Sequence, residues 1–257
     1  MPRWKPFPYP SAQFRYSIAA LRTAWPRLHA GDLEPLPADA RVLSAWALFH
    51  AGEFEAAVEA GLAAGGGGIT VANKAQAIHA TYLEEGERSR LAMFQQVVAR
   101  AQAQAEAEPD NPNAYYWLAY ALGRYSQAIS VTRAMAQGVA GRIRAALERT
   151  IALAPRHADA HVALGAYHAE VIDKLGNLVA RTQGASKEAG LKLLRRAREL
   201  NPGSAIGMIE VANSLVMLEG EKRQAEAEQL YRAAAASEPA DAAERLDVEL
   251  ARSELEE

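Results

Sequence analysis

Apolar residues recur every three to four positions along most of the chain, the spacing of helices that bury one side. In the second half, four such stretches end in an alanine-rich or leucine-rich turn followed by proline: QAQAEAEP at Pro109, TIALAP at Pro155, ARELNP at Pro202 and AAASEP at Pro239. These prolines lie 46, 47 and 37 residues apart. A period of this size is typical of helical-repeat solenoids, in which each helix pair buries its apolar side on the next pair.

The pattern therefore predicts an all-α fold, a right-handed α-solenoid of about five helix pairs with terminal capping helices. Residues 1–10 hold four prolines and three aromatic residues, which predicts an extended arm. Ser11 is the predicted N-cap of a helix that runs to about His29. Residues 11–257 are expected to form a single repeat domain, with pairs at approximately 38–64, 70–107, 111–154, 158–200 and 204–237 and a cap helix at 240–255.

Four consecutive glycines, Gly65–Gly68, interrupt the pattern most strongly. Because each glycine costs a helix about 1 kcal/mol, we expect a flexible turn there. A phosphate-binding loop needs Gly-Lys-Ser/Thr opening a helix after a strand. Here the glycines follow a predicted helix and continue as ITVANKAQ, so the turn is not interpreted as a phosphate site.

The last two pairs resemble tetratricopeptide repeats. The family's first helix carries bulky residues around a Leu-Gly or Leu-Ala pair, and its second helix carries small and bulky residues before a closing proline. Matching positions are His161, Leu164, Gly165 and His168, then Leu194, Ala197 and Pro202; in the next repeat they are Met208, Val211, Ala212 and Leu215, then Ala227, Tyr231, Ala234 and Pro239. The resemblance implies a helical-repeat scaffold, with Gly165 and Ala212 small because the partner helix crosses there.

Two repeats are 12 or 13 residues longer than the family's unit of 34 residues. In each of these repeats the extra residues fall between the two helices of the pair, at 125–138 and at 170–186. The helix that precedes the segment 170–186 is expected at 158–173. This arrangement is similar to the helical-repeat domain of the regulator of microtubule dynamics family and its bacterial relatives. The resemblance covers roughly residues 111–250 and implies a fold rather than an activity.

Composition and charge narrow the class of protein. Half of the residues are apolar, and 28 basic residues against 31 acidic residues give a formal net charge of −3, with the signs interspersed. A nucleic-acid-binding protein would show a basic face, so no nucleic-acid partner is expected. The chain has no cysteine, lacks the continuous apolar run of a secretory signal near its start, and contains no apolar stretch approaching 18 residues. We expect a cytoplasmic protein with no membrane span.

The candidate chemistry is sparse. His157, His161 and His168 fall on one side of a predicted helix, but His168 lies about 10 Å from His161 along the axis, too far to share one ion with it. We interpret the three as packing residues and expect no metal and no cofactor. Glu170 and Asp173 face away from His168, so the chain presents no acid–base pair and no catalytic residue is predicted.

In tetratricopeptide arrays the first helices line a concave groove. The register above predicts that this groove is mostly apolar and is lined by Tyr115, Leu118, Leu122, Val162, Ala166, Ile206, Ile209 and Asn213. Members that bind chaperone C-termini place lysine, asparagine and arginine there, and only Asn213 matches. We predict a non-catalytic module that binds an extended peptide or a partner helix in the groove. The alternative is a carrier of a small apolar ligand, a lipid or fatty acid, enclosed by the long inter-helix segments. The alanine-rich ends also leave a homodimer open.

Overall fold

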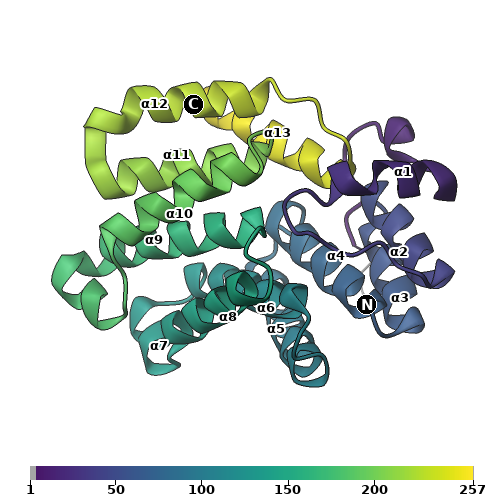
Figure 1. The fold of residues 1–257 in the computed structure, drawn as a ribbon, viewed down its shortest axis with the longest axis horizontal. Helices are drawn as coiled ribbons and strands as arrows, with labels where there is room; N and C mark the ends of the chain where they lie inside the picture. The colour runs from purple at the N-terminus through teal and green to yellow at the C-terminus, as the bar shows by residue number, and fades with distance from the viewer. Residues whose placement is uncertain (1–3, 257) are drawn as a thin grey trace. The chain divides into compact units, whose positions relative to one another are not determined.

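The computed structural model describes residues 4–256, and every regular element within that range is helical (Figure 1). The first three residues of the predicted arm and Glu257 lie outside the described residues. The long helices are α1 (Ile18–Leu28), α2 (Ala40–His50), α3 (Phe54–Ala64), α4 (Gly68–Tyr82), α5 (Glu87–Ala107), α6 (Pro112–Gln127), α8 (Val139–Leu153), α9 (Ala158–Thr182), α10 (Lys187–Leu200), α11 (Ala205–Glu219), α12 (Gln224–Ala235) and α13 (Ala242–Glu256). Shorter elements are η1 (Ala12–Phe14), α7 (Val131–Ala136) and η2 (Gly220–Arg223).

Contacts divide the chain into two compact units. The first comprises the residues up to His29, Glu34–Arg149 and Ala240–Ala243. The second comprises Ala30–Leu33, Thr150–Pro239 and the residues from Glu244 onward. The single repeat domain expected over 11–257 stays a prediction, and the two units are described separately.

Helices of the first unit pack on their neighbours in chain order, α2 on α3, α3 on α4, α4 on α5 and α5 on α6. The first helices of successive pairs also touch, because α4 contacts both α2 and α6. Proline and the Asn111 cap explain the sharp start of α6: the Asn111 side chain accepts hydrogen bonds from the amides of Asn113 and Ala114, and Pro112 needs no partner at the first helical position.

The extended arm is held against the first unit by its aromatic residues. Trp4 stacks on His79 with ring centroids 4.4 Å apart, and Phe7 meets the edge of Phe54 at 6.4 Å. Lys5 forms an exposed ion pair with Glu85. The arm thus covers a histidine near the end of α4.

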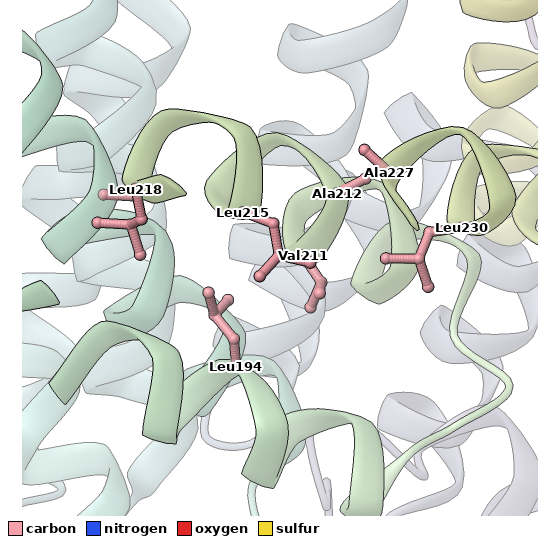
Figure 2. Close-up of a cluster of buried hydrophobic side chains, with 8 residues drawn as sticks. Leu194, Val211, Ala212, Leu215, Leu218, Ala227 and Leu230 are labelled. Atoms are coloured by element: carbon pink, nitrogen blue, oxygen red, sulfur yellow. The ribbon is translucent and has the colours of Figure 1, made fainter. Parts of the chain in front are cut away.

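The second unit contains an apolar cluster that joins α9, α10, α11 and α12. Figure 2 shows Leu194 of α10 pointing toward Val211 and Leu215 of α11. Helix α12 adds its own side chains from the other side, and the described members of the cluster are Ala169, Leu194, Val211, Ala212, Leu215, Leu218, Ala227 and Leu230. Most of these are the positions that the repeat pattern selects, so the apolar spacing places the core.

Gly165 lies where α9 and α10 cross. A Cβ atom at this position would come within 2.7 Å of the Leu194 side chain. Gly165→Leu should therefore lower the free energy of unfolding by about 1–3 kcal/mol through overpacking. Chemical denaturation measures the change, and Gly123→Leu in α6, where no atom lies within 4 Å of an added Cβ, is the control. An unchanged Gly165→Leu midpoint would contradict this packing.

The predicted first helix is wrong at its start. Instead of one helix from Ser11, the chain forms the short η1 and then α1, whose N-cap is Ser17, with its side chain accepting from the amide of Ala20. Pro26 lies inside α1. Proline at that position removes one backbone donor, and α1 ends shortly afterwards at Leu28.

The prediction that all four glycines form a turn is wrong for Gly68. It is the first residue of α4, and it lies against Gly61 of α3, whose own Cβ position would be 2.5 Å from the Gly68 carbonyl oxygen. The two glycines let the backbones of α3 and α4 approach more closely than any side chain would allow. Part of the run therefore serves helix packing.

Helix α9 continues past Asp173, where it was expected to end. The structure carries it to Thr182 with one interruption at Gly176, whose φ of 71° and ψ of 161° are not helical. Much of the long inter-helix segment 170–186 is therefore a continuation of α9 beyond a kink. In the other long segment, residues 125–138, the short α7 forms instead of a plain loop.

Candidate functional site

In the first unit, three aromatic rings from α2 and α6 surround a lysine of α4. Trp46 and Phe49 of α2 and Trp117 of α6 are buried, and α4 between them contributes Lys74. The Lys74 ammonium lies 5.5, 5.2 and 5.8 Å from the three ring centroids, respectively. A cation over ring faces at this distance is stabilised by the ring quadrupoles. The sequence analysis did not single out Lys74.

The three groove residues predicted on α6 differ in exposure. Leu118 and Leu122 are 6% and 2% exposed, so they belong to the core. Tyr115 is half-buried; its hydroxyl donates to the carbonyl oxygens of Ala105 and Pro109, and the Arg149 guanidinium lies over its ring at 5.7 Å. Only Tyr115 of the three keeps a surface that a ligand could reach.

The five groove residues predicted in the second unit lie on α9 and α11, which pack against each other. Val162, Ala166, Ile206 and Asn213 are partly exposed. The Oδ1 atom of Asn213 accepts a hydrogen bond of 2.7 Å from the hydroxyl of Tyr231 in α12. Three of these four partly exposed residues are apolar, and all four lie on helices that contact each other.

Ile209, the fifth, is only 3% exposed. It belongs to a second apolar cluster in which Val248 and Ala251 of α13 pack with it; the other members are Ala205 and Ala234. The C-terminal helix therefore covers the part of α11 on which Ile209 lies. The apolar spacing of α13 indicated a cap, but not which residues of α11 it would cover.

A small hollow lies beside Val162 where α9, α10 and α11 begin or end. Its lining is part apolar and part polar, with Asp159, Arg198 and Ser204 among the polar residues and Ala158, Val162, Ala197, Asn201, Pro202, Gly207 and Met208 completing it. The space that a water-sized sphere can enter is about 10 Å³, which suits about one water molecule. A fatty-acid chain does not fit this hollow.

The three histidines of α9 and its cap all make hydrogen bonds at helix ends. The Nδ1 atom of His157 accepts from the amide of Ala160, 3.1 Å away. His161 donates through Nε2 to the carbonyl oxygen of Pro155, and the Nδ1 atom of His168 accepts from the amide of Ser186. All three are buried. Within residues 4–256 no group of three or more His, Cys, Asp or Glu side chains has the geometry of a metal site.

A buried polar network between α4 and α5 was missed by the sequence reasoning. Arg100 of α5 donates from Nε to Asn73 (2.6 Å) and from Nη2 to Gln76 (2.8 Å) and to the carbonyl oxygen of Ala72 (3.2 Å). Burial lowers the pKa of Arg100 to about 10. Asn73 continues the network to Gln104, and Gln76 continues it to Gln96. The signal that could have found it is the spacing of polar side chains: Asn73 and Gln76 are three residues apart on α4, and Gln96, Arg100 and Gln104 follow at steps of four on α5.

His79 is the other buried group with a strongly shifted pKa. Burial lowers its pKa to about 4, although the negative charge of Glu84 acts in the opposite direction. The side chain is fully buried under Trp4, and neither ring nitrogen has a hydrogen-bond partner within residues 4–256. A neutral imidazole in this position packs as an aromatic ring.

Among the helices of residues 4–256, none is both long enough and apolar enough to span a bilayer.

The chain is similar in fold to solved structures of repeat proteins. It aligns with a thermophilic TPR protein of Thermus thermophilus, TTC0263, at a TM-score of 0.56 and 15% identity, covering 83% of this chain and 97% of that one. This likeness confirms the all-helical, tetratricopeptide-like repeat fold. An assembly chaperone of RpL4 (Acl4) aligns over 93% of this chain and 89% of its own at 14% identity, with a TM-score of only 0.41.

At the level of sequence, none of the curated proteins is significantly similar to this chain. The model of one family, regulator of microtubule dynamics protein 1-3, matches residues 70–256. This match spans well over half of the chain, includes the predicted repeats, and extends beyond the region 111–250 on which the resemblance was based. The chain belongs to the regulator of microtubule dynamics protein 1-3 family.

Proposed function

We propose that the protein is a non-catalytic interaction module that binds an extended peptide or a partner helix on the first helices of its repeats. The observation that carries the proposal is that the apolar side chains of Val162, Ala166 and Ile206 stay partly exposed on α9 and α11, two helices that contact each other. An apolar trough on a rigid helical scaffold suits a partner that contributes its own apolar side chains.

Two further observations support this choice over the carrier of an apolar ligand. The hollow beside Val162 has room for about one water, so it encloses no acyl chain. Ile209, which was expected to face such a ligand, is covered by α13. We therefore propose the interaction module first and keep the carrier as the second candidate.

Peptide selection followed by site-directed variants tests the proposal. Peptides that bind the wild-type chain would be selected from a random display library, and their affinity measured by fluorescence anisotropy. Val162→Asp and Ile206→Asp place a charge on the apolar surface and should weaken binding roughly tenfold or more, because an unpaired charge at a buried contact costs more than about 1.4 kcal/mol.

Leu178→Asp is the matched control. Leu178 is 82% exposed and lies on the part of α9 beyond the Gly176 kink, outside the predicted groove. Its substitution should leave the affinity unchanged. If no peptide bound, or if all three variants weakened binding equally, the proposed groove would be wrong.

A further inference from the structure

The network around Arg100 has a fixed direction, because a guanidinium can only donate hydrogen bonds. Since Asn73 and Gln76 accept from Arg100 through their oxygens, their amide nitrogens must donate onward. Asn73 donates to the Oε1 atom of Gln104 at 3.0 Å, and Gln76 donates to the Oε1 atom of Gln96 at 2.7 Å. Two branches of donors thus run outward from one cation.

The first branch ends at a carboxylate. Having accepted from Asn73, Gln104 donates through Nε2 to Thr70 (2.9 Å) and to the Oε2 atom of Glu108 (3.1 Å). Glu108 also accepts from the side chain of Asn111. An anion therefore terminates the series of donors on this side.

The second branch ends without an acceptor. Gln96 uses its oxygen to accept from Gln76, which leaves its exposed amide nitrogen as a donor, and that nitrogen makes no hydrogen bond to the residues that the structure describes. The Nη1 atom of Arg100 likewise donates to none of them, and it is not among the buried unpaired atoms, so solvent reaches it. Both side chains are held by the amide group of Gln76, so the two open donors belong to the same branch of the network.

Among the residues that the structure describes, no acidic side chain pairs with Arg100. Along α5, residues 88–105 include three arginines and no aspartate or glutamate. Within residues 4–256 Arg100 takes part in no ion pair, and its three acceptors are all neutral. A partly buried guanidinium is ordinarily paired with a carboxylate or phosphate, so this one lacks the partner that its environment favours.

From this geometry we propose that Arg100 Nη1 and Gln96 Nε2 form a binding site for an oxyanion, a carboxylate or phosphate group that closes the second branch as Glu108 closes the first. The inner hydrogen bonds fix the guanidinium in advance, so binding does not need to order it. The site is independent of the groove on α9 and α11, and neither proposal depends on the other.

Inorganic phosphate and sodium acetate serve as probes of the two anion sources. Each would be titrated into the ¹⁵N-labelled protein at constant ionic strength kept with sodium chloride, and the side-chain amide signal of Gln96 followed by NMR. Saturable shifts of that signal with either probe, absent with chloride, are the expected result. A response to one probe only would identify the preferred anion, and a response to neither would overturn the proposal.

Three variants locate the site. Arg100→Gln should weaken the binding of the responding anion on the order of tenfold, as expected for loss of a charge-assisted hydrogen bond. Gln96→Leu leaves the three inner bonds of Arg100 in place and should weaken binding severalfold, which keeps the test valid if Arg100→Gln fails to fold. Because Gln96→Leu lacks the side-chain amide signal, anion binding to this variant is followed through the backbone amide signals of α5.

Arg88→Gln, the third variant, is the control, because it removes the same charge from an exposed position of the same helix. It should bind the anion as the wild type does. Equal weakening in Arg88→Gln and Arg100→Gln would show that the anion senses only the general charge of α5, and the site would be rejected.

Discussion

Acidification from pH 6.5 to pH 4 is expected to remove about 3 kcal/mol of stability through His79 alone. Its pKa is lowered to about 4 in the folded chain, whereas an unfolded histidine titrates near 6.5. Between these values the unfolded chain binds one proton more than the folded chain, so the free energy of unfolding rises with pH. The contribution is complete above pH 6.5 and is lost as the pH falls toward 4.

Urea denaturation of the wild type and of His79→Leu at a series of pH values measures this effect. Leucine keeps an apolar side chain of similar size under Trp4 and cannot be protonated. The difference in unfolding free energy between the two proteins should change by about 3 kcal/mol across this range. Because other titrating groups contribute equally to both proteins, their contributions cancel in this difference.

Trp4→Ala provides a second, independent control. It removes the ring that stacks on His79, so water reaches the imidazole and its pKa should move toward 6.5. The pKa of His79, followed by NMR in both proteins, gives the readout. A wild-type His79 that already titrated near 6.5 would show that the arm does not bury it.

Gly61→Ala should destabilise the first unit by about 3 kcal/mol through overpacking. The added methyl group would lie 2.5 Å from the carbonyl oxygen of Gly68 and 3.2 Å from the amide nitrogen of Ala72. Both are backbone atoms of α4, so no side chain can rotate away and the two helices must separate. This loss exceeds the gain of about 1 kcal/mol that alanine brings to a helix.

Gly67→Ala is the matched substitution for this test. Gly67 belongs to the same glycine run, has a right-handed helical conformation, and leaves room for a methyl group, with the nearest atom 3.8 Å away on Val42. It should be neutral or stabilising by up to about 1 kcal/mol. Thermal unfolding of the two variants would contradict the close crossing if Gly61→Ala were as stable as Gly67→Ala.

Some helix starts depend on local chemistry that the sequence carries. Asn111, Ser186 and Ser204 cap α6, α10 and α11 with their side chains, as local patterns indicate. Errors arose where tertiary contacts decide the backbone. Gly68 is helical because Gly61 crosses it, which no local rule predicts.

The groove was harder to predict than the fold. The sequence indicates on which side of a helix a residue lies, but not which other helix covers that side. Val162 and Ile206 remain partly exposed, whereas Ile209 is covered by a helix that follows much later in the chain. The Arg100 network was missed for a related reason. Its residues look like an ordinary solvated helix face until α4 and α5 are paired.

The kink at Gly176 separates a part of α9 that packs on other helices from a part whose first side chains are exposed. Its backbone conformation, with φ 71° and ψ 161°, is open almost only to glycine. Before it, α9 must match α10 and α11; after it, the side chains from Asn177 to Val179 reach solvent. Substitutions at these three exposed positions therefore leave the register of the repeat untouched, whereas Ala180, the next residue, is fully buried and returns the helix to the packing of the scaffold.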